Sequence, residues 1–468
     1  MAGSSANQNF DDFLAGIPDL VEYFYNDTLA PHSKDRSGLT PVPPEASNWI
    51  EEHRGWRETA VLFDQSHHMP ELFLKGPDAR RLLSELGINS FKNFVPGKAK
   101  QYVACNERGQ MIGECVLFCL GDDSFELVSG MHLQNWVQFH AVSGRYDVSV
   151  ERDLPTAFNP RGRTQFRFGL DGPVSDEILA AALAGPVPEI PFFNFARLRI
   201  AGCEVLALRH GMAGSRGVEL AGPAAEGQRV RDALLEAGRS FGLKPAGSMA
   251  YFSGNSEGGW MPYPLPAVYT APELAPFRRW LPADTWEANS QLGGSFRSAN
   301  LEDYYVTPWD MGYDRIVKFD HDFVGRAALE AMVEGPRRTA VTLHWNEDDV
   351  LEIYRSQFGA ELPYKQLRFP MASYSFQQND EVRDRDGRLV GLSNFCGYSA
   401  NERKVLSLAN VSRDASAVGT QVTLLWGEPG GGSRKRHVER HRQFEVRATV
   451  APYPYAQASQ REPAGQKH

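Results

Sequence analysis

The sequence predicts an α+β protein made of antiparallel sheets covered by helices, with a small β-barrel or sandwich as a separate C-terminal unit. Three short apolar runs follow one another through tight turns between residues 101 and 129, which is typical of an antiparallel meander. After about residue 335, short strand-like runs recur with few long helices. Mixed hairpins and covering helices favour antiparallel layers over a doubly wound parallel sheet, and no Gly-x-Gly-x-x-Gly or Walker-type loop occurs.

The composition is that of an ordinary globular protein with more than one core. A chain of 468 residues, with 42% apolar and 23% charged residues, suggests about two to four domains. The formal charge of −9 argues against a general nucleic-acid or acidic-membrane surface. The first residues lack the basic and apolar regions of a secretory signal, and no apolar run approaches membrane-spanning length. The five cysteines form no Cys-x-x-Cys pair, so we expect a cytoplasmic protein with reduced cysteines.

The first part of the chain contains a helix, a long loop and then a compact set of strands. Helical periodicity covers Asn9 to Asn26, and a loop rich in proline, serine and charge follows from Asp27 to Glu45. The next elements are expected to be the strands Val61–Asp64 and Glu71–Lys75, a helix Asp78–Leu86 capped by Asp78, the meander strands Gln101–Cys105, Met111–Leu120 and Ser124–Ser129, a helix Leu133–Ser143 and a strand Tyr146–Glu151.

A second set of strands and helices begins near Gln165. Its expected members are the strand Phe166–Leu170, the helix Asp176–Leu183, the strands Ala196–Ile200 and Glu204–Arg209, a Gly-rich turn, and the helix Ala225–Phe241. A further strand is expected to start within residues 247–252. The C-terminal strands are expected at Thr339–Trp345, Ala372–Phe376, Leu389–Phe395, Lys404–Val411, Gln421–Trp426 and Phe444–Val450.

The Gly-rich turn between residues 209 and 223 is the most informative local pattern. Three glycines between a strand and Glu219 allow tight turns and close backbone approach to a flat ligand. Glu219 lies among apolar neighbours, where a carboxylate needs a hydrogen-bonding partner. A carboxylate can accept two parallel hydrogen bonds from an amidine-like edge such as that of a pterin. The alternative is a plain β-turn followed by a surface glutamate on an edge strand.

Two more side chains are candidates for a site. Glu114 is a charged residue inside an apolar strand, and it either faces a cofactor amine or lies on the wet face of the sheet. Tyr251 could donate a proton to a developing phenolate, because its ordinary pKa lies near that of phenols. The alternative for Tyr251 is a buried hydroxyl bonded to backbone. No Ser-His-Asp or Cys-His arrangement stands out.

Histidine and acidic residues occur close together at three places where a metal could bind, but none of the three has the residue spacing typical of a metal site. They are the pair His67 and His68, the run Asp320-His321-Asp322, and the pair His437 and His441. Neighbouring side chains in an extended segment point to opposite faces, so one metal rarely uses both members of the first pair. We therefore expect no metal site, and one histidine of that pair either faces a pocket or is structural.

Several motifs in one order resemble the folate-dependent aminomethyltransferase (T-protein) family of the glycine cleavage system, over roughly Ala60 to Val450. The matching stretches are residues 63–67, 112–114, 211–219, 322–329 and 397–399. The chain is still more similar to the tetrahydrofolate-dependent aryl O-demethylases of this superfamily, which act on lignin-derived methoxybenzoates. Those shared stretches are residues 62–65, 67–69, 98–103, 208–214, 292–296, 300–306 and 317–323.

The resemblance implies three domains arranged like a clover leaf around a folate channel. An N-terminal helix and substrate-side loop would span residues 1–47, and a folate-binding α+β region residues 48–335, with two interleaved domains of which the second covers about 160–248. Residues 336–468 would form the C-terminal β-barrel with a disordered tail. The implied cofactor-binding residues are Glu219 for the pterin ring, Glu114 near the reactive nitrogens, and the weaker candidates Gln65 and Trp260. Tyr251 would assist methyl transfer, and His68 would lie beside the phenolic edge of the substrate.

Two positions depart from the pattern of the vanillate-type members. Those enzymes carry an arginine, which would hold the substrate carboxylate, where this chain has Gly130. They also carry tyrosines in the N-terminal loop, where this chain has residues around Ser37 to Leu39. His132 is the candidate replacement for binding the substrate carboxylate. A residue smaller than arginine at position 130, together with a longer N-terminal segment, suits an aromatic ring with two methoxy groups.

The reaction implied by the resemblance is methyl transfer from an aryl methyl ether to N5 of tetrahydrofolate. The products would be 5-methyltetrahydrofolate and a demethylated phenol such as 3-O-methylgallate, with syringate favoured as the substrate. Alternatives are vanillate or 3-O-methylgallate as the main substrate, aminomethyl transfer or amine demethylation, and folate binding without catalysis. The expected partners are small molecules, not nucleic acid or membrane, and the sequence leaves the oligomeric state open.

Overall fold

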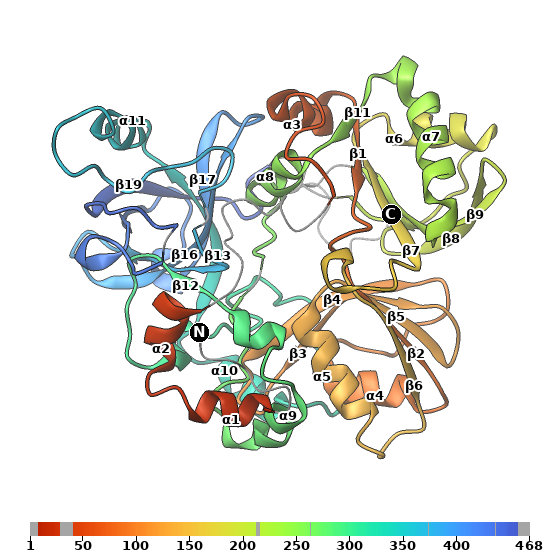
Figure 1. Cartoon of the computed structure of the whole chain (residues 1–468), viewed down its shortest axis with the longest axis horizontal. Helices are drawn as coiled ribbons and strands as arrows, with labels where there is room; N and C mark the ends of the chain where they lie inside the picture. The colour runs from red at the N-terminus through yellow and green to blue at the C-terminus, as the bar shows by residue number, and fades with distance from the viewer. Residues whose placement is uncertain are drawn as a thin grey trace.

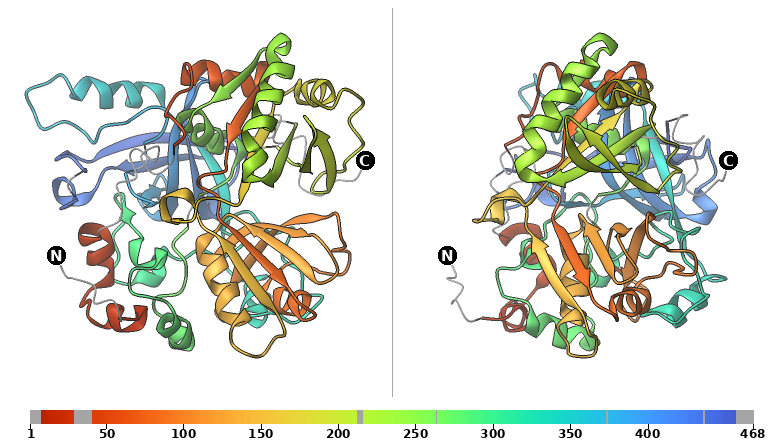
Figure 2. Two further views of the ribbon diagram at one scale, coloured as in Figure 1. Left: turned by 45° about the vertical axis from the view of Figure 1, so that its right-hand side comes forward. Right: turned by 90° about the vertical axis from the view of Figure 1, so that its right-hand side faces the viewer.

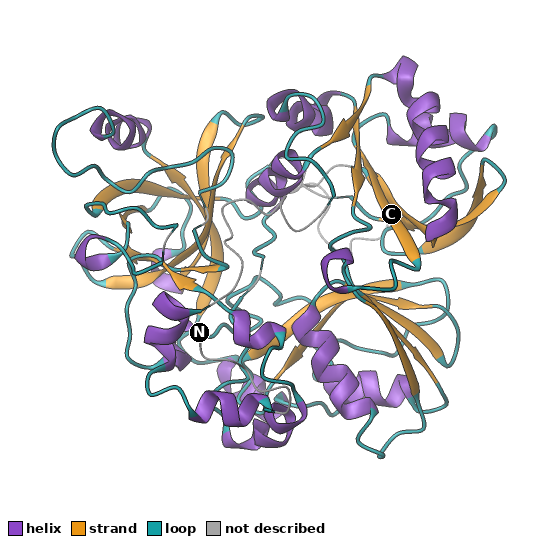
Figure 3. Ribbon diagram, viewed as in Figure 1, coloured by secondary structure: helices purple, strands orange, loops and turns teal. Residues whose placement is uncertain are grey.

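Three sheet-containing bodies surround the centre of the molecule in a computed structural model of the chain (Figure 1). The structure describes residues 8–28, 41–211, 216–262, 264–372, 374–435 and 437–456. A β-barrel lies on one side in Figure 1, and two helix-covered sheets lie on the other. The elements form the antiparallel α+β clover leaf that the sequence and the resemblance predict. Helices such as α6 (Ser175–Leu183), α7 (Gly227–Gly238) and α11 (Glu347–Ser356) lie at the periphery, whereas α3 (Trp49–Glu58) and α8 (Ser248–Gly258) lie near the centre (Figure 1 and Figure 3).

The first body is a five-stranded sheet with the order β3-β4-β5-β2-β6. Its strands are β2 (Glu71–Lys75), β3 (Ala99–Cys105), β4 (Met111–Cys119), β5 (Ser124–Val128) and β6 (Ser149–Asp153), and its helices are α4 (Ala79–Leu86) and α5 (Met131–Ala141). All neighbouring pairs are antiparallel, which confirms the predicted meander. Asp78 holds the N-cap position of α4 as predicted, but its side chain makes no capping bond, because it bonds Arg81 and the Asp147 amide instead.

The second body is a six-stranded sheet with the order β11-β1-β7-β10-β9-β8. Its strands are β1 (Ala60–Asp64), β7 (Gln165–Asp171), β8 (Phe195–Ile200), β9 (Cys203–Arg209), β10 (Gly217–Pro223) and β11 (Leu243–Ala246), with α6 (Ser175–Leu183) and α7 (Gly227–Gly238) along one face. Strand β1 is paired with β7 and β11, not with β2 that follows it in the chain. The side views show α7 lying over this sheet (Figure 2).

The third body is a closed six-stranded barrel with the order β13-β17-β16-β15-β18-β19. Its strands are β13 (Arg338–Trp345), β15 (Asp380–Arg383), β16 (Leu389–Ser399), β17 (Lys404–Ser412), β18 (Gln421–Trp426) and β19 (Phe444–Ala451). The strand expected at Ala372–Phe376 is wrong: pairing starts at β14 (Gln377–Gln378), which bonds the short β12 (Leu292–Gly293). Both residues of β14 are glutamine, so apolar alternation does not reveal this strand. The helix α11 (Glu347–Ser356) was also missed.

The predicted N-terminal helix is interrupted. It consists of α1 (Phe10–Ala15), α2 (Leu20–Glu22) and a π-helical turn at Tyr23–Asp27. Pro18 lies in the break, because proline lacks the backbone N–H that a continuous helix needs and disfavours helical geometry in the preceding residue. The segment packs on α9 (Ala275–Trp280), and the amide of Phe10 donates to the carbonyl of Leu281.

Two helices near the centre were not predicted, and one of them carries Tyr251. The helix α8 (Ser248–Gly258) replaces the strand start expected at residues 247–252, and α3 (Trp49–Glu58) packs against it. Residues 250–257 of α8 are all buried. A helix that is enclosed on every side shows no polar face in its sequence, so the 3.6-residue period is absent. None of the described helices is long and apolar enough to cross a membrane.

Candidate active site

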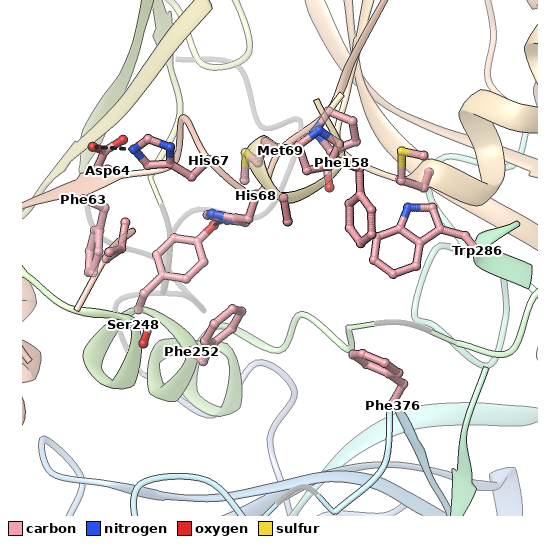
Figure 4. A pocket seen from close by; sticks show the side chains of 18 of the residues that line it. Phe63, Asp64, His67, His68, Met69, Phe158, Ser248, Phe252, Trp286 and Phe376 are labelled. Atoms are coloured by element: carbon pink, nitrogen blue, oxygen red, sulfur yellow. Dashed lines mark hydrogen bonds and ion pairs between the residues drawn. The ribbon is translucent and has the colours of Figure 1, made fainter. Parts of the chain in front are cut away.

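A cavity between the three bodies has walls of aromatic and other apolar side chains with a few polar groups. Its lining includes the aromatic residues Phe63, Tyr251, Phe252, Phe158, Trp260, Trp286 and Phe376, the histidines His67, His68 and His132, and the segments 69–70, 129–131, 246–248 and 289–290. Figure 4 shows Phe63, His68 and Phe252 on one side and Phe158 and Trp286 on the other. Such a cavity suits a flat aromatic ligand, since apolar walls with a few placed polar groups are typical of small-molecule sites.

Tyr251 presents its hydroxyl at this cavity beside two polar side chains. His68 Nε2 lies 3.2 Å from the hydroxyl oxygen, and Gln65 Nε2 donates to it at 3.4 Å. The ring of Tyr251 packs edge-on against Phe63 and Phe252, with centroid distances of 5.1 Å in both cases. The helix α8 therefore places a buried phenol with a fixed ring orientation next to an imidazole, an arrangement that can move a proton.

The two neighbouring histidines have different surroundings because residues 66–68 form a turn. His67 Nδ1 lies 2.9 Å from Thr156 Oγ1, and His67 Nε2 lies 3.5 Å from Asp64 Oδ2. Burial acts to raise the pKa of Asp64, but hydrogen bonds from His67 and Ser66 outweigh it and lower that pKa. Thus His68 contacts the tyrosine, whereas His67 is tied to the ends of neighbouring strands.

Glu114 lies behind the cavity wall and not in it. Its oxygens accept hydrogen bonds from Trp260 Nε1 at 2.8 Å, Gln101 Nε2 at 2.7 Å and the Tyr313 hydroxyl. Burial raises the pKa of Glu114, and the three donors act in the opposite direction. Trp260 lines the cavity, so its indole connects the cavity wall to the buried carboxylate.

Glu219 belongs to a buried cluster of charges around Arg167, which the sequence reasoning missed. Arg167 Nη1 donates to Glu219 Oε1 at 2.5 Å, Nη2 donates to Glu126 at 2.6 Å, and Nε and Nη2 both donate to Glu71. Burial acts to lower the pKa of Arg167, but the three carboxylates outweigh it and raise that pKa. Arg167 interrupts the apolar run 166–170, the same signal that singled out Glu114.

Glu219 and the cavity residue Phe63 lie in one row across the second sheet. Phe63 is paired with Gly169, and Gly169 is paired with Glu219. Side chains that are directly opposite in antiparallel strands share a face. A Cβ atom on Gly169 would lie 3.3 Å from Asp171 Oδ2 and 3.5 Å from Gln65 Nε2, so these two side chains pack close over the bare glycine. Glu219 keeps 7% of its side-chain surface exposed beside this glycine.

His132 lines the same cavity near the start of α5. Its Nδ1 lies 3.5 Å from Glu287 Oε1. Gly130 forms the N-cap of α5 with φ of 67°, and a Cβ there would come within 2.0 Å of the Glu114 carbonyl oxygen. Any larger residue at position 130 would require the backbone to move, which gives the departure at this position a structural basis.

The structure thus brings four of the predicted residues to one cavity: Tyr251, His68, His132 and Trp260. Gln65 touches Tyr251, and Glu114 and Glu219 are placed behind the lining at two different points. Residues 212–215 of the Gly-rich turn and Ser37 to Leu39 lie outside the described residues. The aromatic walls Phe158, Trp286 and Phe376 were missed, because they come from distant segments with no common sequence pattern.

The histidines considered as metal ligands lie apart from this cavity or have other partners. His321 Nδ1 lies 3.0 Å from Asp320, His437 is 3.0 Å from the Tyr374 carbonyl oxygen, and His441 Nε2 accepts from the Glu428 amide. Within the described ranges, no group of three His, Cys, Asp or Glu side chains could hold a metal ion. The five cysteines are buried free thiols.

Comparisons with known proteins give consistent results. The GCVT N-terminal domain family matches residues 23–264. The chain is 44% identical to a syringate O-demethylase of Sphingobium sp. (strain NBRC 103272 / SYK-6), over 96% of each chain. It is 32% identical to a sesamin methylene transferase of Sinomonas sp. (strain No.22), over 88% of this chain and 90% of the relative.

Among solved structures, the glycine cleavage system aminomethyltransferase T of Bartonella henselae is similar in fold. The TM-score is 0.60 at 18% sequence identity, over 92% of this chain and 95% of that chain. At this identity the likeness concerns the fold alone. It extends through all three bodies described above.

Proposed function

Because the chain belongs to the GCVT family, we propose that it is an O-demethylase that moves the methyl group of a lignin-derived methoxybenzoate to N5 of tetrahydrofolate. Enzymes of this family transfer one-carbon units with tetrahydrofolate, and the chain is such an enzyme. Syringate is the proposed substrate, and the proposed products are 3-O-methylgallate and 5-methyltetrahydrofolate. The relative named syringate O-demethylase, which aligns over nearly the whole chain, supports this choice.

The observation that carries the proposal is the Tyr251 hydroxyl, which lies beside His68 at an aromatic-walled cavity. An aryl oxide without a proton is a poor leaving group, so a phenol at the ether oxygen is the chemistry that this bond cleavage needs. The walls formed by Phe252, Phe158 and Trp286 can hold a substituted benzene ring by offset or edge-on contacts.

The proposed step breaks the methyl–oxygen bond while a bond forms between the methyl carbon and N5. Tyr251 would donate its proton to the ether oxygen as that bond breaks, and the proton on N5 would pass to water once the new bond has formed. His68, 3.2 Å away, is placed to return a proton to Tyr251. Positioned proton transfer contributes about 10²- to 10⁴-fold. Holding two substrates in line contributes up to about 7–11 kcal/mol, so positioning is the larger effect.

The proposed folate contacts lie on two sides of Tyr251. Glu219 Oε1 is bound by Arg167, and Oε2 is the atom proposed to accept an N–H of the pterin ring. The ring is proposed to lie against the strand at Gly169, where the backbone carries no Cβ, next to Gln65. Trp260, fixed by its bond to Glu114, would line the channel beyond it.

The domain division, the cellular location and the partners complete the proposal. We divide the chain into residues 1–47, 48–335 and 336–468, with the second α+β unit at about 160–248, and we place the enzyme in the cytoplasm. Its partners are proposed to be the aromatic acid and tetrahydrofolate. Strand β1 pairs with β7 and β11, so a segment that precedes residue 160 also belongs to the sheet of the second unit, as expected for interleaved domains.

The test is mass spectrometry of the purified full chain with syringate, with and without tetrahydrofolate. Loss of one methyl group from syringate should occur only with tetrahydrofolate, in equal amount to the 5-methyltetrahydrofolate formed. Vanillate and 3-O-methylgallate in parallel reactions rank the substrates. No demethylation of any of the three would overturn the proposal.

A second candidate is transfer of a methylene or aminomethyl group. The relative named sesamin methylene transferase supports it, because it aligns over most of the chain. The same assay separates the two functions. A methylenedioxyaromatic compound that yields 5,10-methylenetetrahydrofolate, with syringate left intact, would favour this candidate.

A further inference from the structure

We propose that His132 binds the carboxylate of the aromatic substrate and that the buried Glu287 is the positioning residue that orients and charges it. The inference rests on the proposed function and deepens it, since it names the group that selects aromatic acids over neutral phenols. It is carried by a set of polar contacts behind the far wall of the cavity, formed by α5, β6 and the 3-10 helix Trp286–Asn289.

Glu287 is a fully buried carboxylate with partners of defined geometry. Its Oε2 accepts from Thr285 Oγ1 at 2.6 Å, and Asn135 Nδ2 lies 3.0 and 3.1 Å from the two oxygens. Burial acts to raise the pKa of Glu287, but His132, Thr285 and Asn135 outweigh it and lower that pKa. Glu287 is therefore an anion at neutral pH. Thr285 and Asn135 are neutral donors, and the Arg152 guanidinium interacts with the Glu287 charge without bonding it directly.

Arg152 fixes the orientation of the amide that binds Glu287. Arg152 Nη1 donates to Asn135 Oδ1 at 2.7 Å, which directs Asn135 Nδ2 toward Glu287. Burial lowers the pKa of Arg152 to about 10, so the guanidinium stays charged at neutral pH. The guanidinium and Glu287 are bridged through Asn135, and Oε1, the Glu287 oxygen that Thr285 does not bond, is the one that lies 3.5 Å from His132 Nδ1.

His132 connects this network to the cavity. Its Nδ1 is shielded from solvent and lies 3.5 Å from Glu287 Oε1. The side chain lines the cavity and is 19% exposed, so the far edge of the ring, which carries Nε2, faces the open space. An arriving carboxylate at Nε2 completes a row of alternating charges from Glu287 through the imidazolium to the ligand. Charge-assisted hydrogen bonds of this kind are the strong ones.

The position of His132 relative to Tyr251 fits a benzoate. The Ser129 amide donates to the Pro70 carbonyl at 2.9 Å, so the segment that leads to His132 runs beside the turn that carries His68. Trp286, which precedes Glu287, lies across the cavity from His68 in Figure 4. A ring that spans the cavity can therefore place its methoxy group at Tyr251 and its carboxylate at the opposite wall. Gly130 has no side chain that could bind the carboxylate, and His132 is proposed to bind it instead.

The experiment compares syringate with 2,6-dimethoxyphenol, which has the same methoxy groups and phenol but no carboxylate. We expect wild-type enzyme to have a KM for syringate about 10–100-fold lower than for 2,6-dimethoxyphenol, as one charge-assisted contact gives. His132→Gln and Glu287→Gln should each raise the KM for syringate by a similar factor, with less than about threefold change for the phenol and in the kcat for either compound.

Asp284→Asn is the matched control. Asp284 and Glu287 belong to one short segment, and each variant removes one negative charge. If only the overall charge mattered, both variants would lower the KM for syringate. We expect instead that Glu287→Gln raises this KM and that Asp284→Asn leaves it within about threefold of the wild-type value. An equal change for syringate and 2,6-dimethoxyphenol in the His132 and Glu287 variants, or no change for either, overturns the inference.

Folding and the proposed function are controlled separately. Circular dichroism melting curves show whether Glu287→Gln folds, and His132→Gln, at a partly exposed site, tests the same inference if it does not. Quenching of tryptophan fluorescence by each compound, measured without folate, gives Kd values that need no turnover. If wild-type enzyme binds syringate preferentially but demethylates neither compound, the proposed function fails and the carboxylate site stands. If syringate is demethylated with no preference over the phenol, the site fails and the function stands.

Discussion

The Nε2 atom of His68 and the hydroxyl oxygen of Tyr251 lie 3.2 Å apart, although 183 positions separate the two residues in the chain. His68 comes from the turn between the two helix-covered sheets, and Tyr251 comes from α8, which is packed between α3 and the barrel. The pair therefore exists only when all three bodies are assembled. Its geometry depends both on the side chains that line the cavity and on buried contacts well away from it.

Tyr251→Phe should slow methyl transfer by about 10²- to 10⁴-fold, because the departing oxygen loses its proton donor. The Kd for tetrahydrofolate should change little, since the ring and its packing remain. Single-turnover formation of 5-methyltetrahydrofolate measures the first quantity, and fluorescence titration the second. Tyr364→Phe is the control, as its ring packs at a tilt against Phe444 of the barrel. Wild-type rates in Tyr251→Phe would remove this residue from the mechanism.

Gly169→Ala tests the proposed place of the pterin ring. The added Cβ would lie 3.3 Å from Asp171 Oδ2 and 3.5 Å from Gln65 Nε2, in the row that also holds Glu219, and would keep a flat ring from approaching the strand. We expect the Kd for tetrahydrofolate to rise about tenfold or more, with a Tm near that of the wild type. Gly185→Ala, where a Cβ meets nothing within 4 Å, is the control. Unchanged folate affinity in Gly169→Ala would place the ring elsewhere.

Stability should fall as the pH rises from about 5 to 7, and Glu126 should account for part of the fall. Burial raises the pKa of Glu126 from 4.5 to about 7; Arg167 opposes the shift, and Glu71 and Glu219 add to it. A carboxyl with a raised pKa in the folded state contributes stability that is fully present below pH 4.5. That contribution, roughly 3 kcal/mol, is lost as the pH rises through about 7.

The corresponding measurement is chemical denaturation at several pH values. Glu126→Gln, which cannot titrate, should flatten the decline between pH 5 and 7, whereas the same change at the exposed Glu151 should leave it as in the wild type. An equally steep decline in Glu126→Gln would show that the titration of this group does not control stability in that range.

Glu257→Gln should lower stability by about 3 kcal/mol and also slow catalysis. Glu257 is fully buried on α8, and it binds His53 at 2.5 Å, Arg57 at 2.8 Å and the Ser399 hydroxyl. The change removes a buried carboxylate that binds several partners at once, which is costly. Because α8 also carries Tyr251, kcat should fall while folate affinity is kept.

Glu402→Gln is the matched control for this change. Glu402 also binds Arg57, at 3.0 Å, but 24% of its side chain is exposed, so water can replace the lost interaction. Urea unfolding and steady-state kinetics give both readouts. A kcat equal to that of the wild type in a destabilised Glu257→Gln enzyme would separate this network from the position of Tyr251.

Most strands and several helices could be predicted from the sequence because they are apolar runs that end at turn or capping residues. Runs such as 101–129 alternate or continue with apolar residues and end at glycine-containing turns, so local pattern and local structure agree. The missed α8 and α3 show the limit of this reasoning. Residues 250–257 are enclosed by other elements on all sides, and such a helix carries no periodic polar face. The division into three domains and the site roles remain predictions.

The sequence alone determined the residue types with the right chemistry: Glu219 and Glu114 as acids within apolar strands, Tyr251 as a phenol, and His68 beside a strand end. Only the tertiary structure decided their relations, because these depend on segments that meet across three bodies. It tied Glu219 to Arg167 and not directly to the cavity, enclosed Glu114 behind Trp260, and set Glu287 behind His132. A charged side chain shows in the sequence that it needs a partner, but the identity of that partner is fixed by packing.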